Sequence, residues 1–323
     1  MARILVRAIP VLAMPPAATA QAQELMAAEP PPPPPEPAKP LAYSIPWQLR
    51  PILAPTVVRM DALAAVYSAA PPSGAGLTLS SVVTAAYKIP GTGPKGSGLA
   101  AVLRFAAVGD APPTGTGGAA LVNPLLGATY AHLLGGGFRA NAFLGVTLPI
   151  GMGGGDTPDA GPAAARTKGL NGRAQFDNAL FAVNDLTVIP GLAIAYVDHG
   201  WTVQLEATLF QLTRVRGALS QPDASKTNFT TGLHVGYFVL PNVSVGADLR
   251  YQRWLEPPRS VATDPTGDAK DTASFAIGPR FHIPIDGVGW LRPGLSYGHA
   301  FDKPLAAAPP GYHWIQVDVP LFF

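Results

Sequence analysis

Charged residues in this sequence fall at every second position of extended stretches, so their side chains would project from one face of each strand. On these faces nine cationic positions stand against five anionic ones. The cations are Arg59, Lys88, Arg104, Arg139, Arg214, Arg216, Arg250, Arg280 and Arg292, and the anions are Asp61, Glu206, Asp248, Glu256 and Asp318. A shared wall with surplus arginine raises the local concentration of anions and repels cations. The pattern therefore predicts electrostatic selection of small anions.

Pairing between neighbouring strands is the competing interpretation, because it satisfies charges in a crowded interior. Nine cations minus five anions still leaves four unmatched, so pairing cannot consume the whole excess. We expect Arg104, Arg139, Arg250 and Arg280 to contribute most to the selection. The complete set that we expect to meet a solute is Arg104, Arg139, Glu206, Asp248, Arg250, Arg280, Arg292 and Asp318.

Catalytic and metal-binding motifs are weak in this sequence. The six histidines are His132, His199, His234, His282, His299 and His313, and only His299 and His313, around the last loop, are expected to approach each other. No G-x-S-x-G nucleophile elbow accompanies them. The stretch "GMGGGD" at 151–156 lacks the Lys-Ser/Thr ending of a phosphate loop, so a flexible loop is the better interpretation. We expect no catalytic residue, no metal and no cofactor, with a hydrolase kept as an alternative.

Composition excludes several other classes of protein. Charged residues make up 13% of the chain, against roughly 25% in soluble proteins, while mean hydropathy is only +0.22. No stretch approaches the roughly 20 apolar residues of a transmembrane helix. The net charge of +2 is too small to argue for nucleic acid, and the absence of cysteine removes disulfides, thiol catalysis and thiolate metal sites.

Extended segments recur from about residue 56 to the last residue, with the length that a tilted strand needs to cross a bilayer. We expect strands near 56–68, 77–89, 98–108, 122–134, 138–150, 186–198, 201–216, 226–239, 243–256, 272–284, 290–301 and 312–323. The connections alternate between short Gly- or Asn-containing turns, such as "GGG", "HG" and "PN", and long loops. The longest, residues 151–185, should fold over or into one mouth of the sheet or form an extra hairpin. A soluble sandwich has no reason to keep its long loops at one end.

The two faces of the strands differ as they would between lipid and an aqueous lumen. In 243–256, Val243, Val245 and Leu249 alternate with polar Ser244 and Asp248, and other segments repeat this alternation. Arg253 is the clear outward exception. Aromatic residues on the apolar face fall near strand ends, which is typical of the girdles at membrane interfaces.

The first and last segments complete the pattern. "MARILVRAIPVLAMPPAATAQA" has a basic head, an apolar middle and a small-x-small cleavage site, as a secretory signal does, and a proline-rich stretch follows it. The final "YHWIQVDVPLFF" places Ile315, Val317, Val319, Leu321 and Phe323 on one apolar face. Together these features resemble the Gram-negative outer-membrane β-barrel proteins as a class, over about residues 56–323. The resemblance implies that the terminal aromatic strand is recognised by the barrel-insertion machinery.

We therefore expect an all-β transmembrane antiparallel β-barrel of twelve strands, with ten or fourteen as alternatives. The expected organisation is a signal peptide at 1–22, a proline-rich periplasmic segment at 23–55 and the barrel at 56–323, with both termini periplasmic. The expected partners are outer-membrane lipids, lipopolysaccharide, the insertion machinery and small solutes. The favoured function is a narrow channel for small anionic solutes, and the alternatives are an adhesion barrel acting through its loops and a hydrolase at the rim. Whether residues 23–55 enter the lumen stays open.

Overall fold

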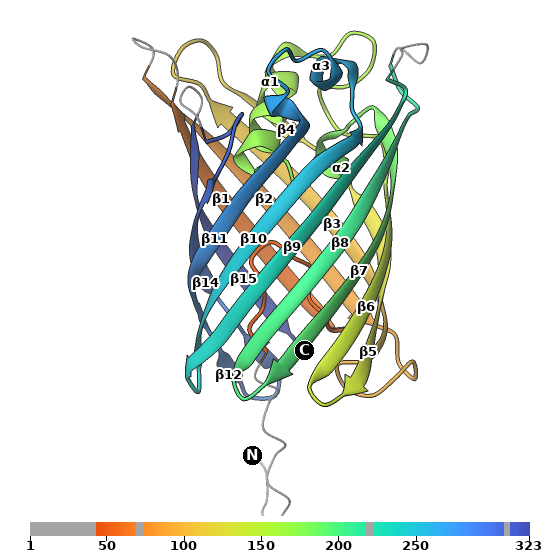
Figure 1. The fold of residues 1–323 in the computed structure, drawn as a ribbon, viewed down its shortest axis with the longest axis vertical. Coiled ribbons are helices and arrows are strands. Elements are labelled where there is room, and N and C mark those ends of the chain that lie inside the picture. Colours follow the sequence, from red (N-terminus) through yellow and green to blue (C-terminus); the bar gives the residue numbers. More distant parts are fainter. Residues whose placement is uncertain (1–42, 69–73, 218–222, 307–310) are drawn as a thin grey trace, which may run out of the picture. The chain divides into compact units, whose positions relative to one another are not determined.

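A computed structural model describes residues 43–68, 74–217, 223–306 and 311–323, and the fold of this part of the chain is a closed antiparallel β-barrel (Figure 1). The expected twelve-stranded wall is confirmed. The wall strands are β1 (Val57–Ser68), β2 (Ala75–Lys88), β3 (Gly98–Ala111), β5 (Leu125–Gly135), β6 (Phe138–Thr147), β7 (Asp185–Asp198), β8 (Trp201–Arg214), β9 (Ser225–Leu240), β10 (Val243–Glu256), β11 (Asp271–Phe281), β14 (Gly294–Ala300) and β15 (Tyr312–Phe322).

The last wall strand pairs with the first and so closes the sheet. The β1–β15 register runs from Val57 opposite Phe322 to Tyr67 opposite Tyr312, over the whole length of β1 except its last residue. Every other wall strand pairs with its neighbours in chain order. A closed ladder leaves no unpaired backbone groups facing lipid, which is the condition for crossing a bilayer with strands.

Three short strands depart from the expected segments. Strand β4 (Gly118–Leu121) pairs with β3 and is separated from β5 by residues 122–124, of which Pro124 has no N–H for the ladder. Strands β12 (Ile283–Ile285) and β13 (Gly289–Leu291) form a small hairpin between β11 and β14. Pro293 separates β13 from β14, so the segment expected as 290–301 is interrupted rather than continuous.

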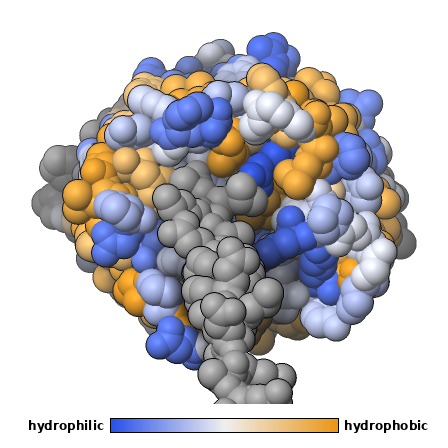
Figure 2. All heavy atoms as spheres, turned by 90° about the horizontal axis from the view of Figure 1, so that it is seen from below, coloured by the Kyte–Doolittle hydropathy of each residue, from blue (hydrophilic) through white to orange (hydrophobic). Residues whose placement is uncertain are grey.

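The alternation of the strand faces is confirmed in the wall. On β10, Asp248 is fully buried while neighbouring Leu249 is 47% exposed, because one side chain points into the barrel and the other points away from it. Viewed along the barrel from below, hydrophobic residues lie around the circumference, between the hydrophilic residues of the turns (Figure 2). Within the described residues no helix is both long and apolar enough to span a membrane.

Connections of different length occupy the two ends of the barrel. One end, here the turn end, carries tight turns such as Gly136–Gly137 and His199–Gly200, in which the glycines adopt positive φ angles. The opposite loop end carries α1 (Ala160–Gly172), α2 (Asn178–Phe181), α3 (Arg259–Ala262) and a 3₁₀ turn, η1 (Asp268–Lys270). Figure 1 shows α1 and α2 at this end, within the outline of the wall.

Two segments fill much of the barrel interior. Residues 43–55, here the N-terminal segment, precede β1 and contact inward-facing side chains of β7 to β10. Residues 151–184, here the inner loop, carry α1 and α2 and pack against inward-facing residues of β2, β3 and β8. The long loop therefore folds into the mouth instead of forming an extra hairpin. Residues 43–55 contact the inward face of the wall and so lie inside the barrel. Residues 1–42, with the expected signal peptide at 1–22 and most of the proline-rich segment expected at 23–55, lie outside the described residues, and that division of the chain stays a prediction.

Candidate functional site

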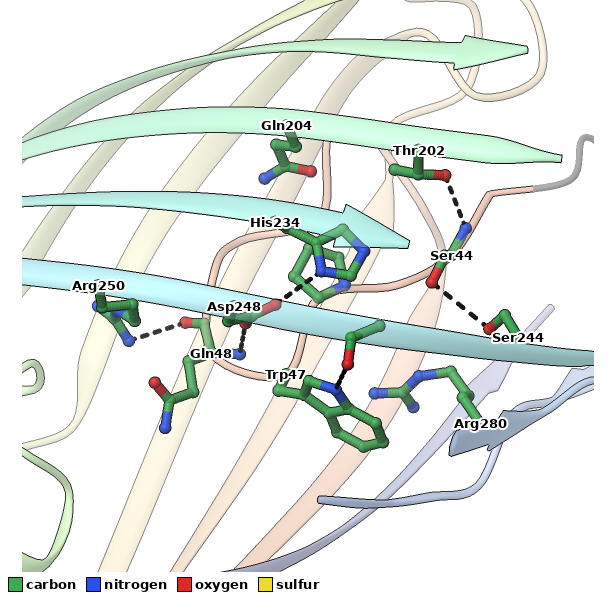
Figure 3. Close-up of polar contacts among 12 residues, drawn as sticks. Ser44, Trp47, Gln48, Thr202, Gln204, His234, Ser244, Asp248, Arg250 and Arg280 are labelled. Atoms are coloured by element: carbon green, nitrogen blue, oxygen red, sulfur yellow. Dashed lines mark hydrogen bonds and ion pairs between the residues drawn. The ribbon is translucent and has the colours of Figure 1, made fainter. Parts of the chain in front are cut away.

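The N-terminal segment has no regular secondary structure, so the side chains of the wall satisfy its backbone donors. The backbone N–H of Ser44 donates to Thr202 Oγ1 at 3.0 Å, and that of Gln48 donates to Asp248 Oδ2 at 2.8 Å (Figure 3). A third bond joins the N–H of Arg50 to Glu206 Oε2 at 2.8 Å. The polar inward face of β8 and β10 thus acts as a docking surface for this segment.

The side chain of Trp47 anchors the middle of the segment. It is 1% exposed, its Nε1–H donates to the carbonyl of Gly246 at 3.3 Å, and the Arg280 guanidinium lies 4.3 Å from its ring centroid (Figure 3). Its backbone carbonyl accepts from Arg59 Nη2 and Gln316 Nε2. The anchor therefore joins aromatic packing with polar contacts from several strands.

Glycines in the wall make room for the N-terminal segment. A Cβ on Gly294 would lie 2.4 Å from the Trp47 ring, and one on Gly236 would lie 2.3 Å from Ser44 Oγ. Inward glycines in strands mark places where another backbone approaches closely. Inward-facing glycines were therefore the sequence feature that indicates an occupied lumen. The interpretation of the charge pattern did not make use of them.

An ion-pair network fixes the inner loop to the wall. Arg173 of the loop contacts Asp61 of β1 at 3.4 Å and Asp177 of the loop at 2.5 Å, while Arg104 of β3 contacts Asp177 at 3.3 Å. Burial alone would raise the pKa of Asp177, but the charges of Arg173, Arg104 and Arg250 outweigh it and hold that pKa below its ordinary value. Asp177 is therefore a carboxylate that ties the loop to the barrel.

Arg250 stands where the two inner segments meet. Its guanidinium lies 3.9 Å from the ring centroid of Phe176 in the inner loop, and its Nη1 donates to the carbonyl of Gln48 in the N-terminal segment at 3.1 Å. It makes no ion pair with any described residue within 4.0 Å. A cation without an ion pair among the described residues thus contacts both segments that narrow the lumen.

A cavity of about 120 Å³ lies between the N-terminal segment and the inner loop, and we call it the chamber. Five arginines and three carboxylates line it. They are Arg50, Arg59, Arg104, Arg173 and Arg250, and Asp61, Asp177 and Glu206. Its other lining residues are largely apolar side chains of the wall, the N-terminal segment and the inner loop.

The residues expected to meet a solute all lie on wall strands or their connections. Some of them line the chamber, and others bind the N-terminal segment or pair with each other. Arg104, Glu206 and Arg250 line the chamber. Asp248 instead holds Gln48 of the N-terminal segment and contacts His234 Nδ1 at 2.6 Å.

A second group lies nearer the turn end. Asp318 contacts both Arg59, at 2.7 Å, and Arg280, at 2.5 Å. Arg292 donates to the carbonyl of Tyr43 at 3.3 Å. Arg139 is 4% exposed, and its side chain has no hydrogen bond or ion pair with any described residue.

The other charged residues of the expected set form ion pairs and hydrogen bonds at the ends of the wall strands. Asp185 contacts Lys226 at 2.5 Å and Arg214 at 3.5 Å, Arg216 donates to the carbonyl of Gly151, and Lys88 donates to the carbonyl of Gly93 in a turn. Glu256 accepts from Thr227. Arg253, expected to face outward, is exposed and contacts Asp271 at 3.5 Å.

Three charged residues of the chamber were missed from the sequence, namely Arg50, Arg173 and Asp177. They belong to the N-terminal segment and the inner loop, where no strand alternation assigns a direction to a side chain. The sequence does show that these charged residues lie outside the strands. It does not show which strand each of them will contact.

Four of the histidines contact other side chains within the described residues. His299 and His313 do approach each other, with parallel rings whose centroids are 4.1 Å apart, yet no group of three metal-binding side chains forms among the described residues. His234 contacts Asp248, and His282 contacts Ser244. The terminal residues Ile315, Val317, Val319 and Phe323 are exposed, and Leu321 is partly so; their role as an assembly signal stays a prediction.

Comparison with solved structures agrees with this architecture. The chain is similar to the COG4313 outer membrane channel from Pseudomonas putida F1, with a TM-score of 0.54 at 12% identity over 87% of this chain and 100% of that chain. Likenesses at lower TM-score include the NanC porin (0.49, 8% identity, 81% of this chain and 98% of that one). The KdgM porin in complex with disordered oligogalacturonate gives 0.44 at 10% identity, over 83% and 99%. No protein-family model and no curated protein matches the sequence. The expected resemblance to outer-membrane β-barrels is confirmed as a shared fold.

Proposed function

We propose that this protein is an outer-membrane channel for small anionic solutes, whose lumen is narrowed by the N-terminal segment and the inner loop. The fold shared with an outer membrane channel supports a channel in that membrane. The observation that carries the anion preference is the chamber lining, where five arginines face three carboxylates, an excess of two positive charges. A lumen wall with surplus cations concentrates anions and repels cations.

The path of a solute through the chamber follows from the contacts on either side of it. A solute arriving from the loop end meets the inner loop, which Arg173 and Asp177 tie to the wall. One arriving from the turn end meets the N-terminal segment. In the chamber, Arg250 has no carboxylate partner among the described residues, so an anion gains a charge-assisted hydrogen bond there without first breaking an ion pair.

The N-terminal segment is held by side-chain contacts and packing, and not by a strand ladder. Within the described residues, its docking rests on the packing of Trp47, on the ion pair between Arg50 and Glu206 at 3.3 Å, and on hydrogen bonds such as those from Ser44, Gln48 and Arg50. Each such bond contributes about 0.5–1.5 kcal/mol, or more where a carboxylate accepts. The wall strands, by contrast, are held by continuous ladders on both sides. Displacement of the N-terminal segment can therefore open the turn end while the barrel stays intact.

Orientation in the membrane follows the rule that such barrels keep their short turns on the periplasmic side. Phe323 and the N-terminal segment lie at the turn end, so we place the C-terminus in the periplasm of a Gram-negative bacterium and the inner loop at the extracellular mouth. The exposed apolar band of the wall is then the surface for outer-membrane lipids and lipopolysaccharide.

Planar-bilayer recordings in a salt gradient test the proposal. The wild-type protein is compared with a variant that lacks residues 155–180, a deletion that removes equal numbers of chamber arginines and carboxylates, Arg173 and Asp177. We expect higher conductance in the deletion variant, with a reversal potential that shows anion selectivity in both proteins.

Cation selectivity in both proteins would contradict the anion preference. Two silent proteins that nevertheless migrate as folded, heat-modifiable barrels would contradict the channel itself and favour an adhesion role for the loops. Unchanged conductance in the deletion variant would show that the inner loop does not limit flow.

A further inference from the structure

We infer that the chamber is a binding site for small amphipathic anions, molecules with one anionic group and an apolar ring or short chain. This inference rests on the proposed function for the route by which such a molecule arrives, but binding itself is independent of flow. It goes beyond selection by charge, because it assigns a role to the apolar half of the chamber.

The apolar half is built by consecutive wall strands and the inner loop. Its residues pack as one cluster, drawn from β2, β3, β5, β6, β7, β8 and α2, and include Val82, Leu125, Phe143, Leu180, Ile189 and Phe210. None of the cluster residues that line the chamber has a polar side-chain atom. A hydroxyl-rich solute placed here would lose hydrogen bonds to water without replacement, at a cost of roughly 1–3 kcal/mol for each unpaired group. The cluster therefore favours a hydrocarbon surface.

The charged part lies against this cluster. Arg250 on β10 and Arg59 on β1 come from strands outside the apolar run, and Arg104 comes from β3 within it. Arg59 is paired with Asp318 and Arg104 with Asp177, whereas Arg250 has no carboxylate partner among the described residues. A guanidinium has five N–H donors, and only one contact of Arg250, that to Gln48, is a hydrogen bond. Arg250 thus has donors left for a carboxylate or phosphate and no ion pair to break first.

Size and charge together exclude other solute classes. A cavity of about 120 Å³ is smaller than the roughly 300–1,000 Å³ of sites for drug-sized ligands, so it suits a single ring or a short chain and not an oligosaccharide. An organic cation would face five arginines, and each of the three carboxylates is already paired with one of them. A one-ring carboxylate satisfies both parts of the chamber at once.

The test uses the purified full-length protein in detergent and four probes, namely benzoate, benzyl alcohol, benzylammonium and acetate. Binding is measured by titration calorimetry. We expect benzoate to bind at least tenfold more tightly than each of the others, since benzyl alcohol and benzylammonium lack the negative charge and acetate lacks the ring. Equal affinities for benzoate and acetate, or for benzoate and benzyl alcohol, would overturn the inference.

Variants locate the bound anion. Arg250→Gln should weaken benzoate binding about tenfold, while Arg253→Gln on the same strand, which faces outward, serves as the matched control and should leave it unchanged. Equal affinities in the two variants would place benzoate elsewhere and overturn the site. Benzoate binding without current in bilayers would refute the channel and support the binding site. Anion current without benzoate binding would support the channel and refute the binding site.

Discussion

Replacing Trp47 with alanine is the most direct way to separate the N-terminal segment from the wall. The indole is fully enclosed, donates to the Gly246 carbonyl and lies under the Arg280 guanidinium. Truncation of a buried tryptophan costs about 3–5 kcal/mol. Because the indole belongs to the N-terminal segment and not to a wall strand, we assign at least about 3 kcal/mol of this loss to docking of the segment. Each 1.4 kcal/mol is a factor of ten, so the undocked population should rise about a hundredfold.

Single-channel recording measures this change as the fraction of time spent at a higher conductance level. The control is Trp201→Ala, which removes an outward-facing, half-exposed aromatic ring at the turn end without touching the N-terminal segment. Heat-modifiable migration on gels checks that both variants close their barrels. If Trp47→Ala lowers the unfolding temperature but leaves the occupancy of the higher level unchanged, the N-terminal segment does not restrict flow and the argument fails.

Three further predictions concern other parts of the barrel. The pKa of Asp177 is lowered in the folded state, so its contribution to docking of the inner loop is complete above the ordinary carboxyl pKa of about 3.9 and is lost as the pH falls through the lowered value. Conductance should therefore stay constant from pH 8 to about pH 4. The variant Asp177→Asn should have a higher conductance than the wild type over this whole range. The double variant R139Q/R250Q should shift the reversal potential toward cations, and an unchanged potential would contradict the anion preference. Replacing Leu321 and Phe323 with aspartate should impair assembly, at roughly 2–4 kcal/mol per charge at mid-bilayer and less near the interface; normal insertion, measured by membrane fractionation, would contradict it.

The wall could be predicted from the sequence because its signal is local. Alternation with period two assigns a direction to each side chain, and the expected strand ends fall within a few residues of those observed, apart from the breaks near Pro124 and Pro293. Arg250 was placed inside the barrel by this alternation alone. The same logic says nothing about what it contacts, because that depends on two segments with no period of their own.

The chamber could not be predicted, because it is formed by two segments whose sequences have no periodic pattern. The contact between Arg173 and Asp61 joins residues 112 positions apart, and no pattern within the inner loop selects β1 as its partner. The N-terminal segment is indicated only weakly in the sequence, by wall glycines such as Gly236 and Gly294. A Cβ at either position would clash with the segment. Such glycines can be recognised only after the inward face has been assigned and the lumen is suspected to be occupied.

The two segments that narrow the lumen are attached to the wall in different ways. The inner loop is held at both ends, by β6 and β7, so on release it remains a tethered arc at the mouth and gains little freedom. Within the described residues, the N-terminal segment is covalently joined to the wall only through β1, and its undocking frees a run of backbone at about 1–2 kcal/mol of conformational entropy per residue. Opening at the turn end is therefore the entropy-driven step, and its frequency should climb more steeply with temperature than opening at the loop end.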